Sequence, residues 1–309
     1  MKSPEGGERA VGREEELAQA YDAARPRLIR VAYSVLGTYS DAEDAVSDTW
    51  LKLVGADRRD RVLDVEAWAT VAVARAALDT LRSTRMRRET YVGPWLPEPI
   101  VERLPSESNP ADRVTLDDSV SYALLVVLES LTPAERTAFV LHDLFAMPFQ
   151  DVASVVGRTP AAVRQLASRA RGHVQASTPR LKVDADEHKR TVSAFLAAAA
   201  GGDLNGLVSL LDHDVVATSD GGGQVSAARR PVQGAEKVAR FILGLLARYV
   251  PDRRADLVMV NGVLGIARYD GDHLDFVVSF GTGGGRIETI DIVRAPEKLE
   301  HAAAGDHLS

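Results

Sequence analysis

The stretch Leu131–Val174, LTPAERTAFVLHDLFAMPFQDVASVVGRTPAAVRQLASRARGHV, predicts a helix-turn-helix. Residues Phe149–Val156 form the expected supporting helix, and Gly157 permits the sharp turn that follows it. Thr159 is the expected N-cap of the second helix, and Pro160 suits its first position because no N–H is needed there. A tight turn followed by a basic second helix is typical of units that enter a DNA groove.

The second helix of this motif is expected to bury Val163 and Leu166 and to turn its polar side chains outward. Arg164 and Gln165 suit base edges, because arginine pairs with guanine and glutamine with adenine, whereas later arginines suit phosphates. The alternative is a helical hairpin with a solvated arginine face; agreement of turn, cap and charge favours DNA binding. The residues predicted to contact DNA here are Ala161, Arg164, Gln165, Ser168, Arg169 and Arg171.

Length and composition limit the remaining possibilities. The chain has 309 residues, enough for two or three domains, and no cysteine, so disulfides and thiolate metal sites are excluded. The N-terminal segment MKSPEGGERAVGREEE has no apolar core of a signal peptide, and no apolar run is long enough to span a membrane. We therefore expect a cytoplasmic protein with no membrane partner and no cofactor.

Charge is unevenly distributed along the chain. The net charge of −7 argues against a protein that coats DNA indiscriminately. Residues 41–48 hold four acids and no base, residues 75–88 hold five arginines and one aspartate, and residues 158–180 hold five arginines and no acid. This segregation predicts partners of both signs.

The pattern along the chain predicts helices at 14–36, 40–53 and 64–88, with a break or kink at Pro26. Residues 89–115 contain five prolines and are interpreted as a linker, although Tyr91, Trp95 and Leu96 are too apolar for a passive one. Helices resume at about 116–131. The predicted domains are 12–90, a linker at 91–115, 116–180 and 185–299, with flexible tails at 1–11 and 300–309.

The last third of the chain predicts an α+β domain. Helices are expected at 188–200, 204–211 and 235–249. Several short strands are expected after and between these helices, which argues for a domain of helices packed on an antiparallel sheet. The expected strands are Val215–Ser219, Val225–Arg229, Leu257–Val260, Leu264–Tyr269, Leu274–Phe280 and Ile287–Val293.

Three segments taken in order are more specific than any one alone. They are DAEDAVSDTWLKL at 41–53, AWATVAVARAALDTLRSTRMRRE at 67–89, and the helix-turn-helix. Together residues 12–178 resemble the extracytoplasmic-function group of the sigma-70 family. The resemblance implies a multidomain fold class, in which two all-α domains, sigma regions 2 and 4, precede the α+β domain. It implies promoter-specific transcription initiation, with promoter DNA and the RNA polymerase core, through its β′ and β subunits, as partners.

The resemblance also assigns roles to residues. Region 4 would read the −35 element through the second helix of the helix-turn-helix, and the loop at 55–64 would accept a flipped base during −10 opening. Backbone charge and stacking are the physics expected for the exposed strand. The implied polymerase-binding residues are Asp41, Glu43, Asp44, Asp48, Trp50, Leu51 and Leu53. The implied −10 contacts are Arg75, Arg82, Arg85, Arg87 and Arg88.

Further motifs narrow the resemblance to a subgroup. WLPEP at 95–99, DGGG at 220–223 and RPVxG at 230–234 resemble sigma factors that carry a C-terminal SnoaL-like domain, the sigma factor J type. Asn261-Gly262 and the APEKL end at 295–299 resemble further motifs of that subgroup. Gln224 stands where the pattern usually has lysine, and APEKL replaces the usual NPDKL. A role that depends on the lysine after DGGG is therefore not expected here.

A SnoaL-like domain implies the nuclear-transport-factor-two-like fold, a curved sheet wrapped by helices around a conical pocket with an unidentified small-molecule ligand. The glycine run favours a turn over a phosphate nest. We hypothesise that Trp95, Leu96 and Pro97 form an interdomain regulatory contact with Asp220, Gly221, Gly222 and Gly223. The acid and histidine candidates for catalysis, Asp212, His213, Asp214, Asp220, His273, Asp275 and Asp291, show no strong catalytic constellation, so no catalytic or metal residue is predicted.

Two other functions remain open at this point. A ligand-sensing repressor or activator also joins a helix-turn-helix to a pocket domain, but the acidic segment at 41–53 and the basic helix ending at 88 count against it. A SnoaL-like isomerase or cyclase with a DNA-binding appendage would need a catalytic constellation. With a sigma factor that carries its own regulator, a separate anti-sigma factor is not required.

Overall fold

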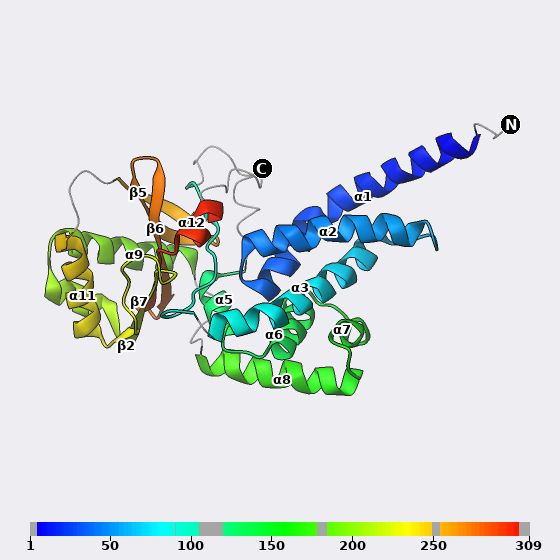
Figure 1. Cartoon of the computed structure of the whole chain (residues 1–309). Coiled ribbons are helices and arrows are strands. Elements are labelled where there is room, and N and C mark those ends of the chain that lie inside the picture. Colours follow the sequence, from blue (N-terminus) through cyan, green and yellow to red (C-terminus); the bar gives the residue numbers. More distant parts are fainter. Residues whose placement is uncertain (1–4, 90, 105–119, 178–183, 249–253, 303–309) are drawn as a thin grey trace. The chain divides into compact units, whose positions relative to one another are not determined.

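The computed structural model describes residues 5–89, 91–104, 120–177, 184–248 and 254–302 (Figure 1). The chain divides into two compact units. The helical unit comprises residues 1–86 and 131–173, and the sheet unit comprises residues 87–130 and 174–309. No helix in the described ranges is long and apolar enough to cross a membrane.

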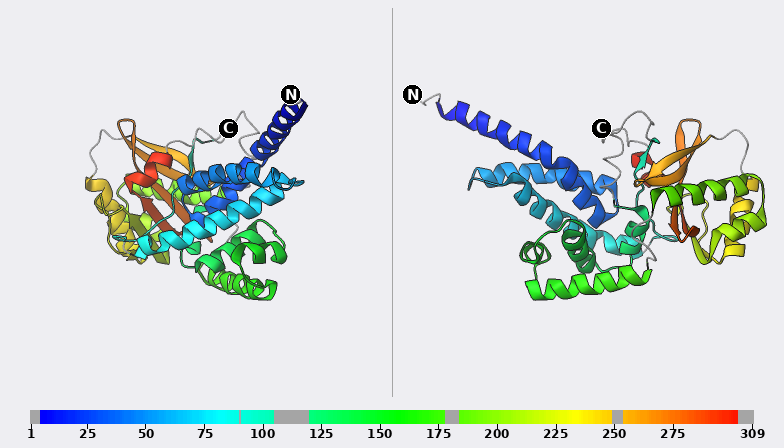
Figure 2. Two further views of the ribbon diagram at one scale, coloured as in Figure 1. Left: turned by 45° about the vertical axis from the view of Figure 1, so that its right-hand side comes forward. Right: turned by 180° about the vertical axis from the view of Figure 1, so that it is seen from behind.

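The helical unit begins with the antiparallel helices α1 (Glu5–Leu36) and α2 (Tyr39–Asp57), and α3 (Val65–Glu89) follows. Figure 2 shows α2 running back alongside α1. At one end Arg13 Nη2 donates to Asp57 Oδ1 at 2.8 Å, and further along the Tyr21 hydroxyl donates to the Val46 carbonyl at 2.6 Å. These bonds set the register of the pair.

Two expectations about α1 are wrong. The helix starts at Glu5, so residues 5–11 of the expected flexible tail are helical, although two of them are glycines. The helix also continues through Pro26, so the expected break there is wrong, while the alternative of a kink stays a prediction. A proline inside a helix costs about 3 kcal/mol. The fully buried Leu28 and Val31 beside it supply the packing that outweighs this cost.

The helix-turn-helix is confirmed, and its supporting helix has the predicted bounds. Helices α6 (Pro133–Phe139) and η1 (Val140–Leu144) lead to α7 (Phe149–Val156) and α8 (Pro160–Ser177). Gly157 between α7 and α8 has a φ of 71°, the left-handed conformation the turn requires. The Ala162 N–H donates to Thr159 Oγ1 at 3.2 Å, which confirms the predicted cap.

The front helices and the helix-turn-helix share one core within the helical unit. Val31 of α1 and Leu78 of α3 belong to the same buried cluster as Leu141 and Val163. Arg136 of α6 is only 1% exposed, and its Nε donates to the Ser34 carbonyl at 3.2 Å. A buried guanidinium bonded to the end of α1 therefore ties the two segments together.

The sheet unit contains a seven-stranded sheet in the order β1-β4-β5-β6-β7-β2-β3. All neighbours are antiparallel except the parallel pair β2 and β7. The strands are β1 (Val101–Glu102), β2 (Leu211–Asp220), β3 (Val232–Gln233), β4 (Ala255–Val260), β5 (Val263–Asp270), β6 (His273–Gly283) and β7 (Arg286–Val293). The helices are α5 (Tyr122–Leu128), α9 (Ala185–Ala200), α10 (Leu204–Leu210), α11 (Ala235–Arg248) and α12 (Pro296–Ala302).

Different elements pack against the two faces of the sheet. On one face Ile290 and Ile292 of β7 belong to a core with residues of α9, α10 and α11. On the other face Val293 belongs to a second core with Leu96 of the linker and Tyr122 of α5. The fold class is confirmed: helical sigma regions precede a domain of helices and a sheet (Figure 1).

Three local expectations about the sheet unit are corrected. Residues Val225–Arg229 form no strand, because the Gly221 carbonyl accepts the N–H groups of Gln224 and Val225 and closes a turn there. The short strand β1 was not expected, since two residues between prolines carry no periodicity. Helix α12 continues to Ala302, so residues 300–302 of the expected C-terminal tail are helical.

Candidate linker-binding site and nucleic-acid surfaces

Asp220 at the end of β2 is the centre of a network of hydrogen bonds in the sheet unit. Its side chain is fully buried. Oδ1 accepts from the Tyr91 hydroxyl at 2.6 Å and from the Gly222 N–H at 3.0 Å. Oδ2 accepts from the Leu96 N–H at 2.9 Å and from Lys298 Nζ at 2.6 Å. Four donors, two of them from the linker, therefore satisfy one buried carboxylate.

Lys298 of α12 supplies the positive charge that balances Asp220. Its Nζ also donates to the Leu96 carbonyl at 2.6 Å and lies 3.3 Å from the centroid of the Trp95 ring. Lys298 is 3% exposed. A buried ammonium is stable only when it is paired, and an aromatic face adds further stabilisation. The cation therefore comes from the APEKL motif, while Gln224 after the glycines is exposed.

Tyr91 completes this group, to which we give the name linker latch: Tyr91, Trp95, Leu96, Asp220 and Lys298. The Tyr91 and Trp95 rings meet edge to face with centroids 4.8 Å apart. Burial, together with the hydrogen bond to Asp220, raises the pKa of Tyr91 above its ordinary value. The phenol therefore stays protonated and remains a donor.

The glycine loop lies directly against the start of the linker. Gly222 and Gly223 have φ of 65° and 70°, a conformation that favours glycine. A Cβ on Gly223 would lie 3.1 Å from the Val92 Cβ, which is closer than ordinary packing allows. Trp95 and Leu96 are thus brought together with Asp220 and its glycines. Buried Pro97 contributes its carbonyl, which accepts from the Tyr122 hydroxyl at 2.8 Å.

A second fixed point lies at the other end of the linker. Asn261, in the turn between β4 and β5, accepts from the Ile100 N–H at 3.0 Å through Oδ1 and donates to the Val120 carbonyl at 3.3 Å. The pairing of β1 with β4 follows directly. Sequence reasoning singled out Asn261-Gly262 and APEKL as motifs but predicted no role for Asn261, Lys298 or Tyr91. The signal for Asn261 and Lys298 lay in these motifs and that for Tyr91 in its apolar character within the linker, and their partners lie too far along the chain to be inferred.

The acidic side chains predicted to bind polymerase lie on α2. Asp44 and Asp48 are exposed, Asp41 and Glu43 are half-buried, and Leu51 is 71% exposed. Trp50 is half-buried against the Tyr21 ring, with centroids 5.4 Å apart. Leu53 is corrected: it is fully buried because it faces the unit's core, so it offers nothing to a partner.

The arginines predicted to hold the −10 strand lie on α3. Arg75 is exposed, and its Nη2 donates to the Ser154 carbonyl of α7 at 3.1 Å. Arg82 is exposed near Asp79, 3.5 Å away. The side chains of Arg85, Arg87 and Arg88 lie outside the described residues.

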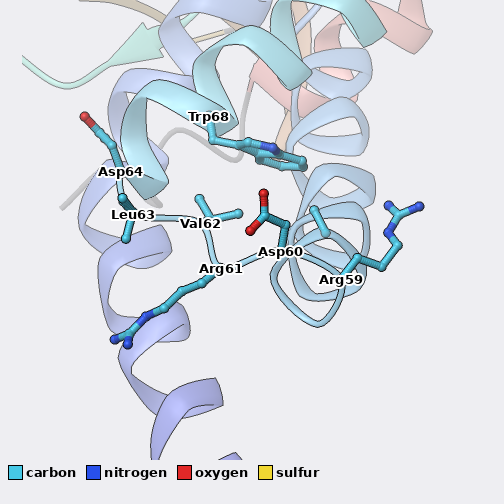
Figure 3. Close-up of a pocket in the computed structure, with 8 residues that line it drawn as sticks. Arg59, Asp60, Arg61, Val62, Leu63, Asp64 and Trp68 are labelled. Carbon is cyan, nitrogen blue, oxygen red and sulfur yellow. The ribbon is translucent and has the colours of Figure 1, made fainter.

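The loop predicted to accept a flipped base borders a pocket of about 520 Å³. Figure 3 shows the Trp68 indole facing Asp60 and Val62, with Arg59 and Arg61 extending away on either side. An aromatic face beside arginines suits a stacked base and its phosphate. The lining residues are Ala56, Arg59, Asp60, Arg61, Val62, Leu63, Asp64 and Trp68.

The outer face of α8 carries the residues predicted to read the −35 element. The Arg164 guanidinium lies 5.2 Å from the centroid of the Phe149 ring, which holds it near the start of the helix. Arg171 is half-buried, and its Nε donates to Asp143 at 2.6 Å. The other predicted residues, Ala161, Arg164, Gln165, Ser168 and Arg169, are exposed.

The acids and histidines considered for catalysis do not converge in the described part of the sheet unit. His213 is exposed beside Asp214, and Asp275 pairs with Arg294 at 3.3 Å. Burial raises the pKa of Asp291 to about 7. Within the described residues no group of three or more histidine, aspartate or glutamate side chains could hold a metal ion.

Comparison with known proteins agrees with this geometry. The sigma-70 region 2 family matches residues 20–87, and the sigma-70 region 4 family matches residues 121–174. The ECF RNA polymerase sigma factor SigJ of Mycobacterium tuberculosis is 47% identical over 249 residues, which span 79% of this chain and 78% of that protein. The probable ECF RNA polymerase sigma factor SigI of the same species is 32% identical over 301 residues, 94% of this chain and 97% of that protein.

The crystal structure of M. tuberculosis SigJ extends the likeness to three dimensions. It covers 94% of this chain and 100% of that one, with a TM-score of 0.73 and 39% identity. The similarity therefore includes the sheet unit as well as the two sigma regions. This chain belongs to the extracytoplasmic-function group of RNA polymerase sigma factors.

Proposed function

We propose that the C-terminal SnoaL-like domain of this sigma factor holds the linker between regions 2 and 4 and thereby sets their relative placement. The observation that carries the proposal is the buried Asp220 carboxylate. It accepts from the Tyr91 hydroxyl and the Leu96 N–H of the linker and is neutralised by Lys298. In this proposal region 2 spans 12–90, the linker 91–115, region 4 116–180 and the SnoaL-like domain 185–299.

The linker is the natural point of control. Helix α3 ends at Glu89 and α5 begins at Tyr122. The conformation of the segment between them therefore affects the distance between regions 2 and 4. The linker latch fixes residues 91–96, and Asn261 fixes Ile100. A short tether between two binding modules sets their effective concentration on a shared target.

Sigma factors are transcription initiation factors and not enzymes, and family membership therefore sets aside the isomerase and the free-standing repressor. We assign polymerase binding to the exposed acidic face of α2. Asp44 and Asp48 would complement a basic coiled coil of the β′ subunit, and Leu51 would add apolar contact. The same proposal includes contact with the β subunit.

Promoter reading is assigned to two surfaces. The pocket beside Trp68 and the arginines of α3 would hold the opened −10 strand, and Arg75 would join once its bond to Ser154 opens. The exposed face of α8 would enter the −35 major groove, with Arg164 and Gln165 nearest the base edges.

Transcription with purified core polymerase tests the proposal. The chain with Lys298→Met is compared with wild type and with Arg240→Met, a control on the exposed face of α11 that breaks the surface pair with Glu236. We expect Lys298→Met to change promoter-specific initiation several-fold and Arg240→Met to leave it unchanged. A chain lacking residues 185–309 should also differ from wild type.

Unaltered transcription in both the point variant and the truncated chain would refute control by the fused domain. A separate anti-sigma factor is not required by this proposal. Affinity capture of the full chain from its own cells should therefore recover polymerase without a second inhibitory protein.

A further inference from the structure

The Phe149 ring at the start of α7 contacts an arginine of the next helix. The Arg164 guanidinium of α8 lies over this ring, 5.2 Å from its centroid, which is within the range of a cation–π contact. Phe149 is half-buried and packs against the core of the helical unit, while Arg164 is exposed. One ring therefore connects the packed core of the helix-turn-helix to a side chain that faces solvent.

A second aromatic contact fixes the Phe149 ring. The His142 ring of η1 stacks on it, with centroids 3.7 Å apart and an angle of 27° between the planes. His142 Nδ1 lies 3.0 Å from the Met147 carbonyl oxygen, and because a carbonyl can only accept, Nδ1 carries the proton in this hydrogen bond. The bond ties His142 to the segment just before α7. The orientation of the Phe149 ring is thus determined by η1 as well as by its own helix.

The contact with Phe149 orients Arg164 without neutralising its charge. Arg171, about two turns further along α8, pairs with Asp143 at 2.6 Å, whereas no ion pair among the described residues involves Arg164. A contact with a ring face needs no hydrogen-bond acceptor, so it leaves the N–H donors of the guanidinium available. These donors can therefore meet the O6 and N7 acceptors of a guanine.

We infer that Phe149 is a positioning residue, which sharpens base specificity at one position of the −35 element by holding the Arg164 guanidinium over its ring. An exposed arginine has many rotamers, and ordering it on binding costs free energy. The Phe149 ring restricts these rotamers before DNA is bound, so less free energy is lost when the guanidinium meets a base. This inference rests on the proposed assignment of Arg164 to −35 reading.

Binding of the holoenzyme to promoters that carry each of the four bases in turn at every −35 position tests the inference. Arg164→Ala identifies the position that Arg164 reads. Phe149→Leu keeps an apolar side chain for the core and removes the ring, and it should lower the preference at that same position about two- to fivefold, the range of an exposed cation–π contact. Phe149→Tyr keeps the ring and should retain the wild-type preference. Phe145→Leu is the matched control and should also retain it, because Phe145 packs against the same core and the ring under Arg164 is that of Phe149.

A double-mutant cycle separates positioning from a general structural effect. In the Arg164→Ala background Phe149→Leu should change the affinity for the promoter no further, since the side chain that the ring orients is absent. If circular dichroism shows that Phe149→Leu does not fold, pentafluorophenylalanine at position 149 replaces it. This residue keeps the shape of the ring but reverses the charge of its face, and it should lower the preference at the same position.

Three results would overturn the inference alone: equal effects of Phe149→Leu in the two backgrounds, loss of the preference in Phe149→Tyr, or a wild-type preference in Phe149→Leu beside a lost preference in Arg164→Ala. Wild-type base preference at every −35 position in Arg164→Ala would instead refute the proposed role of Arg164, and the inference with it.

Discussion

Replacing Lys298 with methionine is the sharpest perturbation of the linker latch. The substitution keeps the apolar stem and removes the ammonium that lies 2.6 Å from Asp220 Oδ2 and 2.6 Å from the Leu96 carbonyl. Asp220 is fully buried, so its carboxylate is left without its counter-charge. Its remaining donors are Tyr91, Leu96 and Gly222.

The expected cost follows from these contacts. Removing one partner of a buried ion pair costs about 3–5 kcal/mol. Three donors still bond to Asp220 in the variant, so we expect a loss of stability at the lower limit of this range, about 3 kcal/mol. At about 1.4 kcal/mol for each factor of ten, the linker should open about 100-fold more often.

Hydrogen exchange of the full chain measures this opening directly, because the Leu96 N–H donates to Asp220. Peptides that cover residues 91–104 should exchange about 100-fold faster in Lys298→Met. The control Arg240→Met breaks a surface pair with Glu236, in which the side chains are 64% and 68% exposed, and should shift unfolding by less than about 1 kcal/mol.

A double-mutant cycle that combines Lys298→Met with Asp220→Asn measures the interaction energy between Lys298 and Asp220. The combined variant should lose less stability than the sum of the single variants, because each single change already removes the same interaction. Linker exchange that stays at the wild-type rate in Lys298→Met, or additive losses in the cycle, would refute the reasoning.

Three further predictions concern other parts of the chain. In holoenzyme binding assays Arg164→Ala should cost about 1–3 kcal/mol and relax base preference at one −35 position. Arg169→Ala should instead weaken all sequences equally. Gly223→Ala, at φ 70° and with its Cβ 3.1 Å from Val92, should destabilise by about 1–2 kcal/mol and speed linker exchange. For Asp291 the unfolded pKa is 3.8 and the folded pKa about 7, so the free energy of unfolding should decrease as the pH rises from 3.8 to about 7. Asp291→Asn should remove up to about 4 kcal/mol of this pH dependence. Wild-type pH dependence in Asp291→Asn, measured by urea unfolding, would contradict this assignment.

The helix-turn-helix was predictable because its determinants are local. Gly157 closes the turn, Thr159 caps the next helix and Pro160 starts it, all within four residues. The strands of the C-terminal domain were predictable in the same way wherever their apolar residues alternate. The strand predicted at Val225–Arg229 does not form, because the Gly221 carbonyl accepts the N–H groups of Gln224 and Val225 in a turn.

The linker latch could be predicted only in part. Trp95 and the DGGG motif carried a signal of contact, since an aromatic residue in a proline-rich segment needs a partner. Lys298 could not be placed, because its partner Leu96 is 202 residues away in sequence. The short strand β1 likewise depends on β4 and on Asn261 for its existence. Pro26 shows packing overriding a residue's local preference.

The most direct test of the central claim is transcription from promoters that differ only in the spacing between the −35 and −10 elements. If the C-terminal domain holds the linker, wild type with core polymerase should initiate from one spacer length and lose activity when a base pair is added or removed. Lys298→Met should broaden that profile and reduce the difference between the best and the neighbouring spacers. Identical spacer profiles for wild type and Lys298→Met would contradict the account.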